Sequence, residues 1–260
     1  MHEGLQPFQV RRLIAEGEMA SPTAGICPGY VQANLVILKN SYAKDFLDFV
    51  LLNPKPCPLL EVIDDGTPIS KKMAPGSDVT KDIPLYRVFI DGKFVEEPSD
   101  ISSFWENGMI AFLIGCSLTF EEALVKSGIR LKHYEQNKRV PMYDTNIPCA
   151  ASKKFHGNYV VSMRPIKNNL IEKAIEITSQ MEYAHGAPVQ IGNPQQIGIK
   201  NINAPDYGDP LEIEEDETPV FWACGVTPQA AAIKAKPDIM MTHSPGYMLI
   251  CDKKIDNFIS

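Results

Sequence analysis

The sequence predicts an α/β protein, and three observations support this class. Short apolar segments alternate along the chain with amphipathic segments of helical period. Clusters of Gly, Pro, Asn and Asp separate these segments. Two apolar segments also run directly into sequences typical of a helix start, near residues 115–119 and 224–228.

The first fifty residues predict a helix, a strand and a second helix. Residues 6–18 carry an apolar stripe of helical spacing, which Gly17 weakens and Pro22 ends. Residues 30–38 alternate in polarity, so the amides of Gln32 and Asn34 share one face of a strand. That face is either exposed to solvent or a row of amides that binds carboxylate oxygens. Residues 41–53 have the inward apolar pattern of a helix.

The next segment predicts linkers, a long loop and a hairpin. Three prolines between residues 54 and 58 lead into a short apolar strand at 59–63. Residues 64–84 are rich in Gly, Pro, Asp and Lys and read as a surface loop, either mobile or a lid. Residues 86–97 alternate on both sides of Asp91-Gly92, as in a β-hairpin.

The second half of the chain repeats this alternation of elements. Residues 140–149 and 157–166 read as extended, and residues 168–181 form an amphipathic helical pattern. Residues 185–199 predict short strands broken by Gly and Pro, and an acidic, turn-rich connection follows. The chain closes on an extended apolar segment at 239–252.

The two strand-to-helix joints are the strongest functional candidates. At the first, residues 111–114 predict a strand buried on both faces, and Thr119 with Glu122 predicts a capping box. At the second, Thr227 is the predicted N-cap before a proline at the first helical position. The turns would contain Cys116 and Ser117 at the first joint and Cys224 and Gly225 at the second.

Each joint would place free backbone N–H groups and the positive end of a helix dipole beside a cysteine. Such an environment binds carboxylates and oxyanions and lowers the pKa of a thiol. The alternative is that small residues stand here because only they fit between strand and helix.

The other candidates are single residues with structural alternatives. Arg164 could clamp a carboxylate, or form a surface ion pair. His185 and His243 stand beside Gly and Pro at predicted strand edges, where they could act as acid or base or serve as hydrogen-bonded structure. Glu121, in the first turn after the first joint, is a further acid–base candidate.

Composition excludes several classes of function. The net charge of −7 and the lack of basic runs argue against nucleic-acid binding. No apolar run has the length of a membrane span, and the first residues lack a secretion signal, which favours the cytoplasm. Six scattered cysteines without a CxxC pair favour reduced thiols. The five histidines match no metal motif, and phosphate-binding loops are absent, so no cofactor is indicated, although a divalent cation stays open.

Seven ordered blocks make the chain resemble the D-glutamate cyclase family, often labelled hydro-lyases, over about residues 7–252. The blocks are TAGICPGYVQANLVIL, GCSLTFEEAL, PMYDTNIPC, VVSMRPI, HGAPVQIGNPQQIGI, PVFWACGVTPQ and THSPGYMLICD. The resemblance implies a three-layer α/β/α part with a smaller two-layer α/β part. It also implies a lyase that converts D-glutamate to 5-oxo-D-proline and water.

We place the smaller part at residues 129–215 and the larger part at residues 1–128 with 216–260. For the cyclisation, the joints would stabilise an oxyanion, and a Cys116 thioester is an alternative route. The expected partner is a small carboxylate or amino acid, and a homo-oligomer is left open. Two other functions also stay open: a lyase or hydrolase acting on another small carboxylate, and a non-catalytic protein that binds such an acid.

Overall fold

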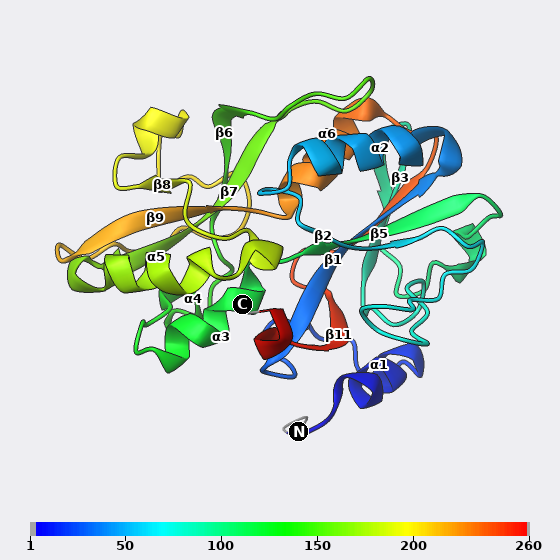
Figure 1. The fold of residues 1–260 in the computed structure, drawn as a ribbon, viewed down its shortest axis with the longest axis horizontal. Coiled ribbons are helices and arrows are strands. Elements are labelled where there is room, and N and C mark those ends of the chain that lie inside the picture. The colour runs from blue at the N-terminus through cyan, green and yellow to red at the C-terminus, as the bar shows by residue number, and fades with distance from the viewer. Residues whose placement is uncertain (1–3, 259–260) are drawn as a thin grey trace.

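A computed structural model describes residues 4–258 and contains two antiparallel sheets (Figure 1). The larger sheet has seven strands, and its central strand β1 pairs with β5 on one side and with β10 and β11 on the other. Its strands, in spatial order, are β2 (Leu59–Ile63), β5 (Met109–Gly115), β1 (Tyr30–Lys39), β10 (Met240–His243), β3 (Tyr86–Ile90) and β4 (Lys93–Glu96), with β11 (Leu249–Lys254) also beside β1. The predicted α/β class is confirmed.

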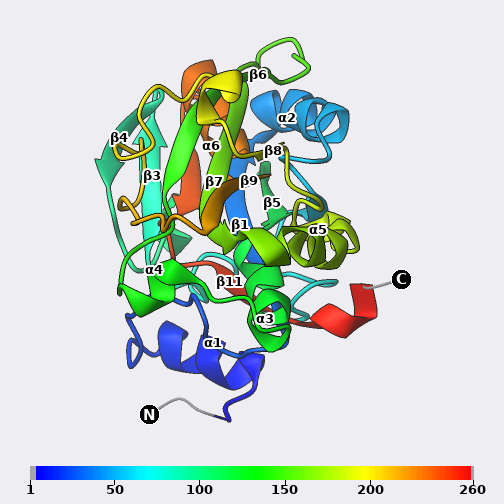
Figure 2. The same ribbon diagram turned by 90° about the vertical axis from the view of Figure 1, so that its left-hand side faces the viewer.

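The smaller sheet has four strands, in the order β6 (Met142–Pro148), β7 (Asn158–Lys167), β9 (Glu217–Ala223) and β8 (Gln190–Ile191). The helices α3 (Leu118–Lys126) and α5 (Ile171–Ser179) lie side by side next to it, and α4 (Lys132–Glu135) follows α3 (Figure 2). The proposed division of the chain at residues 128/129 and 215/216 stays a prediction. At one point the sheets divide the chain differently, since β9 follows residue 216 yet pairs with β7.

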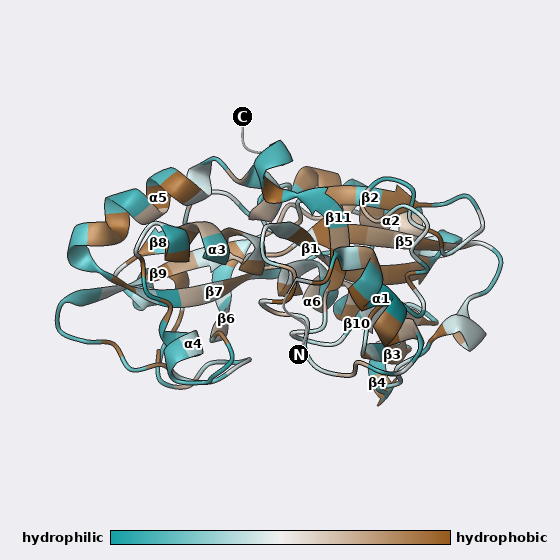
Figure 3. Ribbon diagram, turned by 90° about the horizontal axis from the view of Figure 1, so that it is seen from below, coloured by the Kyte–Doolittle hydropathy of each residue, from teal (hydrophilic) through white to brown (hydrophobic). Residues whose placement is uncertain are grey.

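Helices cover one face of the larger sheet. The side chains of α2 (Asn40–Leu52) and α6 (Val226–Ala235) pack with Val36 and Leu38 of β1 in one apolar cluster. The central strands of this sheet are mostly apolar, whereas many of the connecting loops are polar or of mixed polarity (Figure 3). The helix α1 (Pro7–Ala15) packs against β11. Short 3₁₀ turns complete the elements: η1 (Ser102–Phe104), η2 (Asn168–Leu170), η3 (Glu182–Ala184), η4 (Pro194–Ile197) and η5 (Ile255–Phe258).

The segment 64–84 covers part of the opposite face. It was expected to be a surface loop, but Met73, Ala74, Val79 and Ile83 are buried in the main core. The carboxylate of Glu61 fixes its start by accepting hydrogen bonds from the Ser70 hydroxyl and from three successive backbone N–H groups, at residues 71–73. A segment held in this way is part of the core rather than a free lid.

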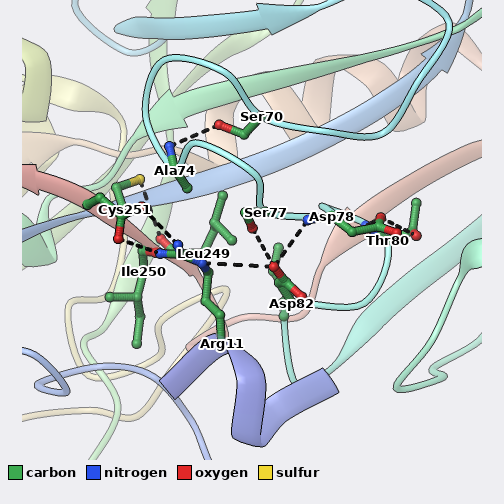
Figure 4. Close-up of polar contacts among 12 residues, drawn as sticks. Arg11, Ser70, Ala74, Ser77, Asp78, Thr80, Asp82, Leu249, Ile250 and Cys251 are labelled. Atoms are coloured by element: carbon green, nitrogen blue, oxygen red, sulfur yellow. Dashed lines mark hydrogen bonds and ion pairs between the residues drawn. The ribbon is translucent and has the colours of Figure 1, made fainter. Parts of the chain in front are cut away.

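A buried arginine fixes the other end of this segment. Arg11 of α1 donates to the carbonyl oxygen of Ile250 at 2.7 Å and to the carboxylate of Asp252. Its Nε lies 3.9 Å from Asp82, which also accepts a hydrogen bond from the Ser77 hydroxyl (Figure 4).

The helices formed by residues 4–258 are all too short or too polar to span a bilayer.

Candidate active site at the junction of the two sheets

The first joint connects β5 of the larger sheet to α3, as expected. β5 ends at Gly115 and α3 begins at Leu118. Gly115 has no room for a side chain, because a Cβ there would overlap the carbonyl oxygen of Tyr183. Its backbone N–H donates to the carbonyl oxygen of Pro58 at 2.8 Å. The chain is therefore clamped at the point where it leaves the sheet.

The predicted capping box at this joint is wrong. Thr119 lies inside α3, and its hydroxyl is 3.4 Å from the backbone N and O of Gln32. The carboxylate of Glu122 accepts a hydrogen bond from the backbone N–H of Gly29 instead of closing the box. The pairing of β5 with β1 ends at Ala33, so the backbone of Gln32 is left for the hydroxyl of Thr119, and the carboxylate of Glu122 binds just before β1.

The second joint connects β9 of the smaller sheet to α6. β9 ends at Ala223 and α6 begins at Val226. The predicted cap is again wrong, because Thr227 lies inside the helix. Its hydroxyl accepts from the backbone N–H of Val160 at 2.9 Å and lies 3.2 Å from the carbonyl oxygen of the same residue. Thr227 therefore ties α6 to β7 of the smaller sheet.

Asn34 lies between the two joints. Its side-chain Nδ2 donates to the carbonyl oxygen of Gly115 at 2.7 Å. A Cβ on Gly225 would overlap the same Nδ2 atom, so the second joint lies directly against Asn34. The two helix starts, far apart in the sequence, are thus brought together around one buried amide.

Burial determines the state of the two cysteines at the joints. Cys116 and Cys224 are each 8% exposed. Burial raises the pKa of the Cys116 thiol to about 12, although the N–H of Leu118 and the charge of Arg164 act in the opposite direction. Burial likewise raises the pKa of Cys224. The expected lowering of the thiol pKa is therefore wrong, because desolvation outweighs the helix N-terminus.

Arg164 forms a buried ion pair next to the first joint. Its Nε and Nη2 atoms donate to one oxygen of Glu121 at 2.8 and 2.5 Å. Its Nη2 also donates to the hydroxyl of Ser117 at 3.2 Å, and Nη1 donates to the hydroxyl of Ser162 at 3.0 Å. The sequence analysis missed Ser162, although it stands two residues before Arg164 and so shares its face of β7.

Glu121 is held as a carboxylate by three neighbouring side chains. Its second oxygen accepts from the hydroxyl of Tyr134 at 2.5 Å and lies 3.3 Å from Nε2 of His133. Burial acts to raise the pKa of Glu121, but Arg164 and His133, with the hydrogen bonds from His133 and Tyr134, together lower it to about 2. His133 and Tyr134 come from the four-residue helix α4, and no pattern in the sequence links them to α3.

Two aromatic rings complete the surroundings of the guanidinium group. The Arg164 Cζ atom lies 4.9 Å from the ring centre of Phe120 and 5.6 Å from that of Trp222. Both rings and Arg164 are almost fully buried. The rings keep water away from the ion pair and add cation–π attraction. The positive charge of Arg164 is therefore fixed beside Ser117 at the start of α3.

The two candidate histidines occupy different surroundings. His185 follows η3 with a φ of 79°, and its Nδ1 lies 3.0 Å from the carbonyl oxygen of Lys55. Its ring also faces the backbone of Gly115 and lies near the charge of Arg164, which places His185 beside the first joint. His243 accepts at Nδ1 from the N–H of Leu35 at 3.0 Å and lies 3.1 Å from Nε2 of Gln229. Burial lowers the pKa of both histidines to about 4, so both rings are neutral at pH 7.

The structure therefore brings together most, but not all, of the candidates. The residues joined at the two helix starts are Asn34, Cys116, Ser117, Glu121, Arg164, His185, Cys224 and Gly225. His243 contacts β1 and α6 but has no contact with the ion pair among the described residues. One cavity of about 440 Å³ lies elsewhere, along β2 and residues 64–72. Among residues 4–258, no three His, Cys, Asp or Glu side chains form a group that could hold a metal ion.

Comparison with known proteins places these residues in a family. Residues 110–252 match the model of the D-glutamate cyclase family, a range that begins in β5 and includes both joints. The chain is 53% identical over 253 residues to "Putative hydro-lyase Teth514_1597" of Thermoanaerobacter sp. (strain X514), covering 97% of this chain and 96% of that protein. It is 50% identical to "Putative hydro-lyase BLi00500/BL02808" of Bacillus licheniformis, covering 98% and 97% of the two chains. The chain belongs to the D-glutamate cyclase family.

Proposed function

We propose that this chain is a hydro-lyase that converts D-glutamate to 5-oxo-D-proline and water. In this reaction the α-amine attacks the γ-carboxyl carbon, an amide bond forms, and the displaced oxygen leaves as water. Membership of the family and the names of the relatives support the reaction class. The observation that carries the assignment to a site is the meeting of two helix N-termini around Asn34, beside the buried charge of Arg164.

Two helix starts that meet at one place suit a substrate with two carboxylates. Helix N-termini bind anions through backbone N–H groups and the helix dipole. The same groups can stabilise the negative oxygen that develops when the amine adds to the γ-carboxyl group. Arg164 already binds Glu121 and two serine hydroxyls. The charge of Arg164 is balanced by the Glu121 carboxylate, so we assign Arg164 to placing Ser117 and reserve direct carboxylate binding for the helix starts.

The protonation states of Glu121 and His185 decide which of the two can act as the base. Attack requires a neutral amine, so a base must accept a proton from the ammonium group. Glu121 was one candidate, but a carboxyl group whose pKa is about 2 is a weak base and carries no proton to donate at neutral pH. We assign it to holding Arg164. Neutral His185, which lies beside Gly115 and Arg164 at the first joint, is the preferred base, because its pKa of about 4 lies above that of Glu121.

The cysteines take a different role from the one their position first indicated. A thiol whose pKa is about 12 is protonated at neutral pH, so a Cys116 thioester would require a base next to the sulfur. We propose that Cys116 and Cys224 line the joints as neutral thiols. The candidate side chains are at least nine-tenths buried, and we propose that the segments covering them move to admit the substrate.

The proposal is tested by incubating the protein with D-glutamate and measuring 5-oxo-D-proline by chromatography. We expect product from the wild type, little from Arg164→Lys, and retained activity in Cys116→Ser if Cys116 only lines the joint. Cys149→Ser is the matched control, because Cys149 is 9% exposed and lies in the cluster of α2 and α6. Full activity of Arg164→Lys would remove Arg164 from the site.

A thermal-shift screen separates this function from its alternatives. D-glutamate and 5-oxo-D-proline should raise the melting temperature by mass action. Stabilisation by D-glutamate without any product would identify a binding protein instead of an enzyme. Stabilisation by a different small acid alone would identify another substrate.

A further inference from the structure

The amide of Gln32 is held in one orientation by its surroundings. Gln32 lies on β1 and is 5% exposed. Its Nε2 donates to the carbonyl oxygens of Thr23 at 2.8 Å and Ile26 at 3.1 Å. Carbonyl oxygens only accept hydrogen bonds, so the NH₂ group must face them and the amide cannot be reversed.

The fixed orientation leaves Oε1 of Gln32 as a buried acceptor without a donor among residues 4–258. Buried polar atoms of folded proteins almost always have a partner, and an unpaired one destabilises the fold. The side chain was expected to donate to carboxylate oxygens, but its N–H groups are already used. The atom that is free is one that needs a hydrogen-bond donor.

Gln32 lies where the two helix starts meet. It is two residues before Asn34, so both side chains point to the same face of β1, the face where Gly225 lies against Asn34. Ala33 pairs with Gly115, so the next position in this register places Gln32 opposite Cys116. The hydroxyl of Thr119 in the first turn of α3 contacts the backbone of Gln32. Gln32 therefore touches the first turn of α3 through its backbone, and its side chain shares the face of β1 on which α6 begins.

We propose that Oε1 of Gln32 accepts a hydrogen bond from the α-amino group of the substrate. This rests on the proposed function. The site would then combine helix N-termini for carboxylates with one neutral acceptor for an amine, the arrangement that selects an α-amino acid over a plain dicarboxylic acid.

The neutral character of this acceptor also suits the reaction. A carboxylate facing the amine would favour the ammonium form, which cannot attack. An amide oxygen accepts a hydrogen bond from either protonation state and adds no negative charge. Gln32 can therefore hold the amine in place while its proton leaves.

The test measures the binding of a ligand series by calorimetry to the full chain. D-glutamate carries a donor on its second carbon, D-2-hydroxyglutarate carries a weaker one, glutarate carries none, and 2-oxoglutarate presents only an acceptor. The wild type should bind them in this order, with D-glutamate about 10-fold to 100-fold tighter than glutarate. In Gln32→Met the preference for D-glutamate over glutarate should disappear, because the acceptor is lost.

Gln136→Met is the matched control, because Oε1 of Gln136 is also unpartnered but belongs to the end of α4. Its ligand preference should equal that of the wild type. A folded Gln32→Met protein that keeps the preference would overturn the assignment of Gln32. So would a wild type that binds 2-oxoglutarate as tightly as D-glutamate, a result that needs no variant. A wild type that binds none of these acids would instead overturn the proposed function.

Discussion

The ion pair between Glu121 and Arg164 should contribute strongly to stability, and Glu121→Gln tests this. The substitution keeps the shape of the side chain but removes the charge that faces the guanidinium group. The pKa of Glu121 is lowered from 4.5 to about 2, which corresponds to about 3 kcal/mol of stability at neutral pH. Leaving one charge of a buried pair without its partner typically costs about 3–5 kcal/mol. We therefore expect Glu121→Gln to lose about 3 kcal/mol at pH 7.

The dependence on pH has a definite sign. The folded pKa of Glu121 lies below the unfolded one, so its contribution is complete above about pH 4.5 and is lost as the pH falls toward 2. The difference between wild type and variant should therefore be full at pH 7 and shrink below about pH 4.5. Urea unfolding can be followed by tryptophan fluorescence, because Trp222 lies against Arg164.

A matched control is available on the surface. Glu135 pairs with Arg130 and is exposed, so Glu135→Gln should leave the unfolding midpoint nearly unchanged. The reasoning fails if Glu121→Gln is as stable as the wild type at pH 7. It also fails if the loss of stability is the same at about pH 3 as at pH 7, because the ionisation of Glu121 would then not be its cause.

Three further predictions concern the joints. Burial raises the pKa of Cys116 to about 12, so iodoacetamide at pH 8 should label this thiol far more slowly in the folded than in the urea-unfolded protein. Mass spectrometry of the peptide that contains Cys116 measures the labelling rate, and fast labelling of the folded protein would contradict the prediction. Gly115→Ala should lower the free energy of unfolding by about 1–3 kcal/mol, since the new methyl group overlaps the carbonyl oxygen of Tyr183, and an unchanged urea midpoint would refute that geometry. Thr227→Val should cost about 1–3 kcal/mol by leaving the buried N–H of Val160 without its acceptor, whereas Thr227→Ser should retain most of the stability.

The sequence was sufficient to predict the joints but not their internal hydrogen bonds. A short apolar run followed by helical spacing is a local signal, and β5 with α3 and β9 with α6 follow it. The hydroxyls of Thr119 and Thr227 also carry a local signal for capping, yet both bond to strands from distant parts of the chain. Tertiary contacts replaced the expected caps, and such contacts are invisible to a reading of neighbouring residues.

The electrostatics of the site were least accessible from the sequence. Arg164 and Glu121 are 43 positions apart, and their pairing depends on α3 lying against β7. The thiol pKa was predicted from the helix dipole alone, whereas desolvation is the larger effect once Cys116 is buried. The direction of the Gln32 amide likewise depends on two carbonyl oxygens in the loop before β1.

The topology explains why two joints about a hundred residues apart lie against the same residue, Asn34. Both sheets are antiparallel, so the joints do not meet because parallel strands end at a common edge. They meet because each joint is a place where the chain passes from one sheet to the other. After β5 the chain leaves the larger sheet through α3 and builds the smaller one, and after β9 it returns through α6 to β10. The two crossings lie next to each other, because the side chain of Asn34 donates to the carbonyl oxygen of Gly115 at the first and lies against Gly225 at the second. A substrate bound at this place would contact both sheets at once.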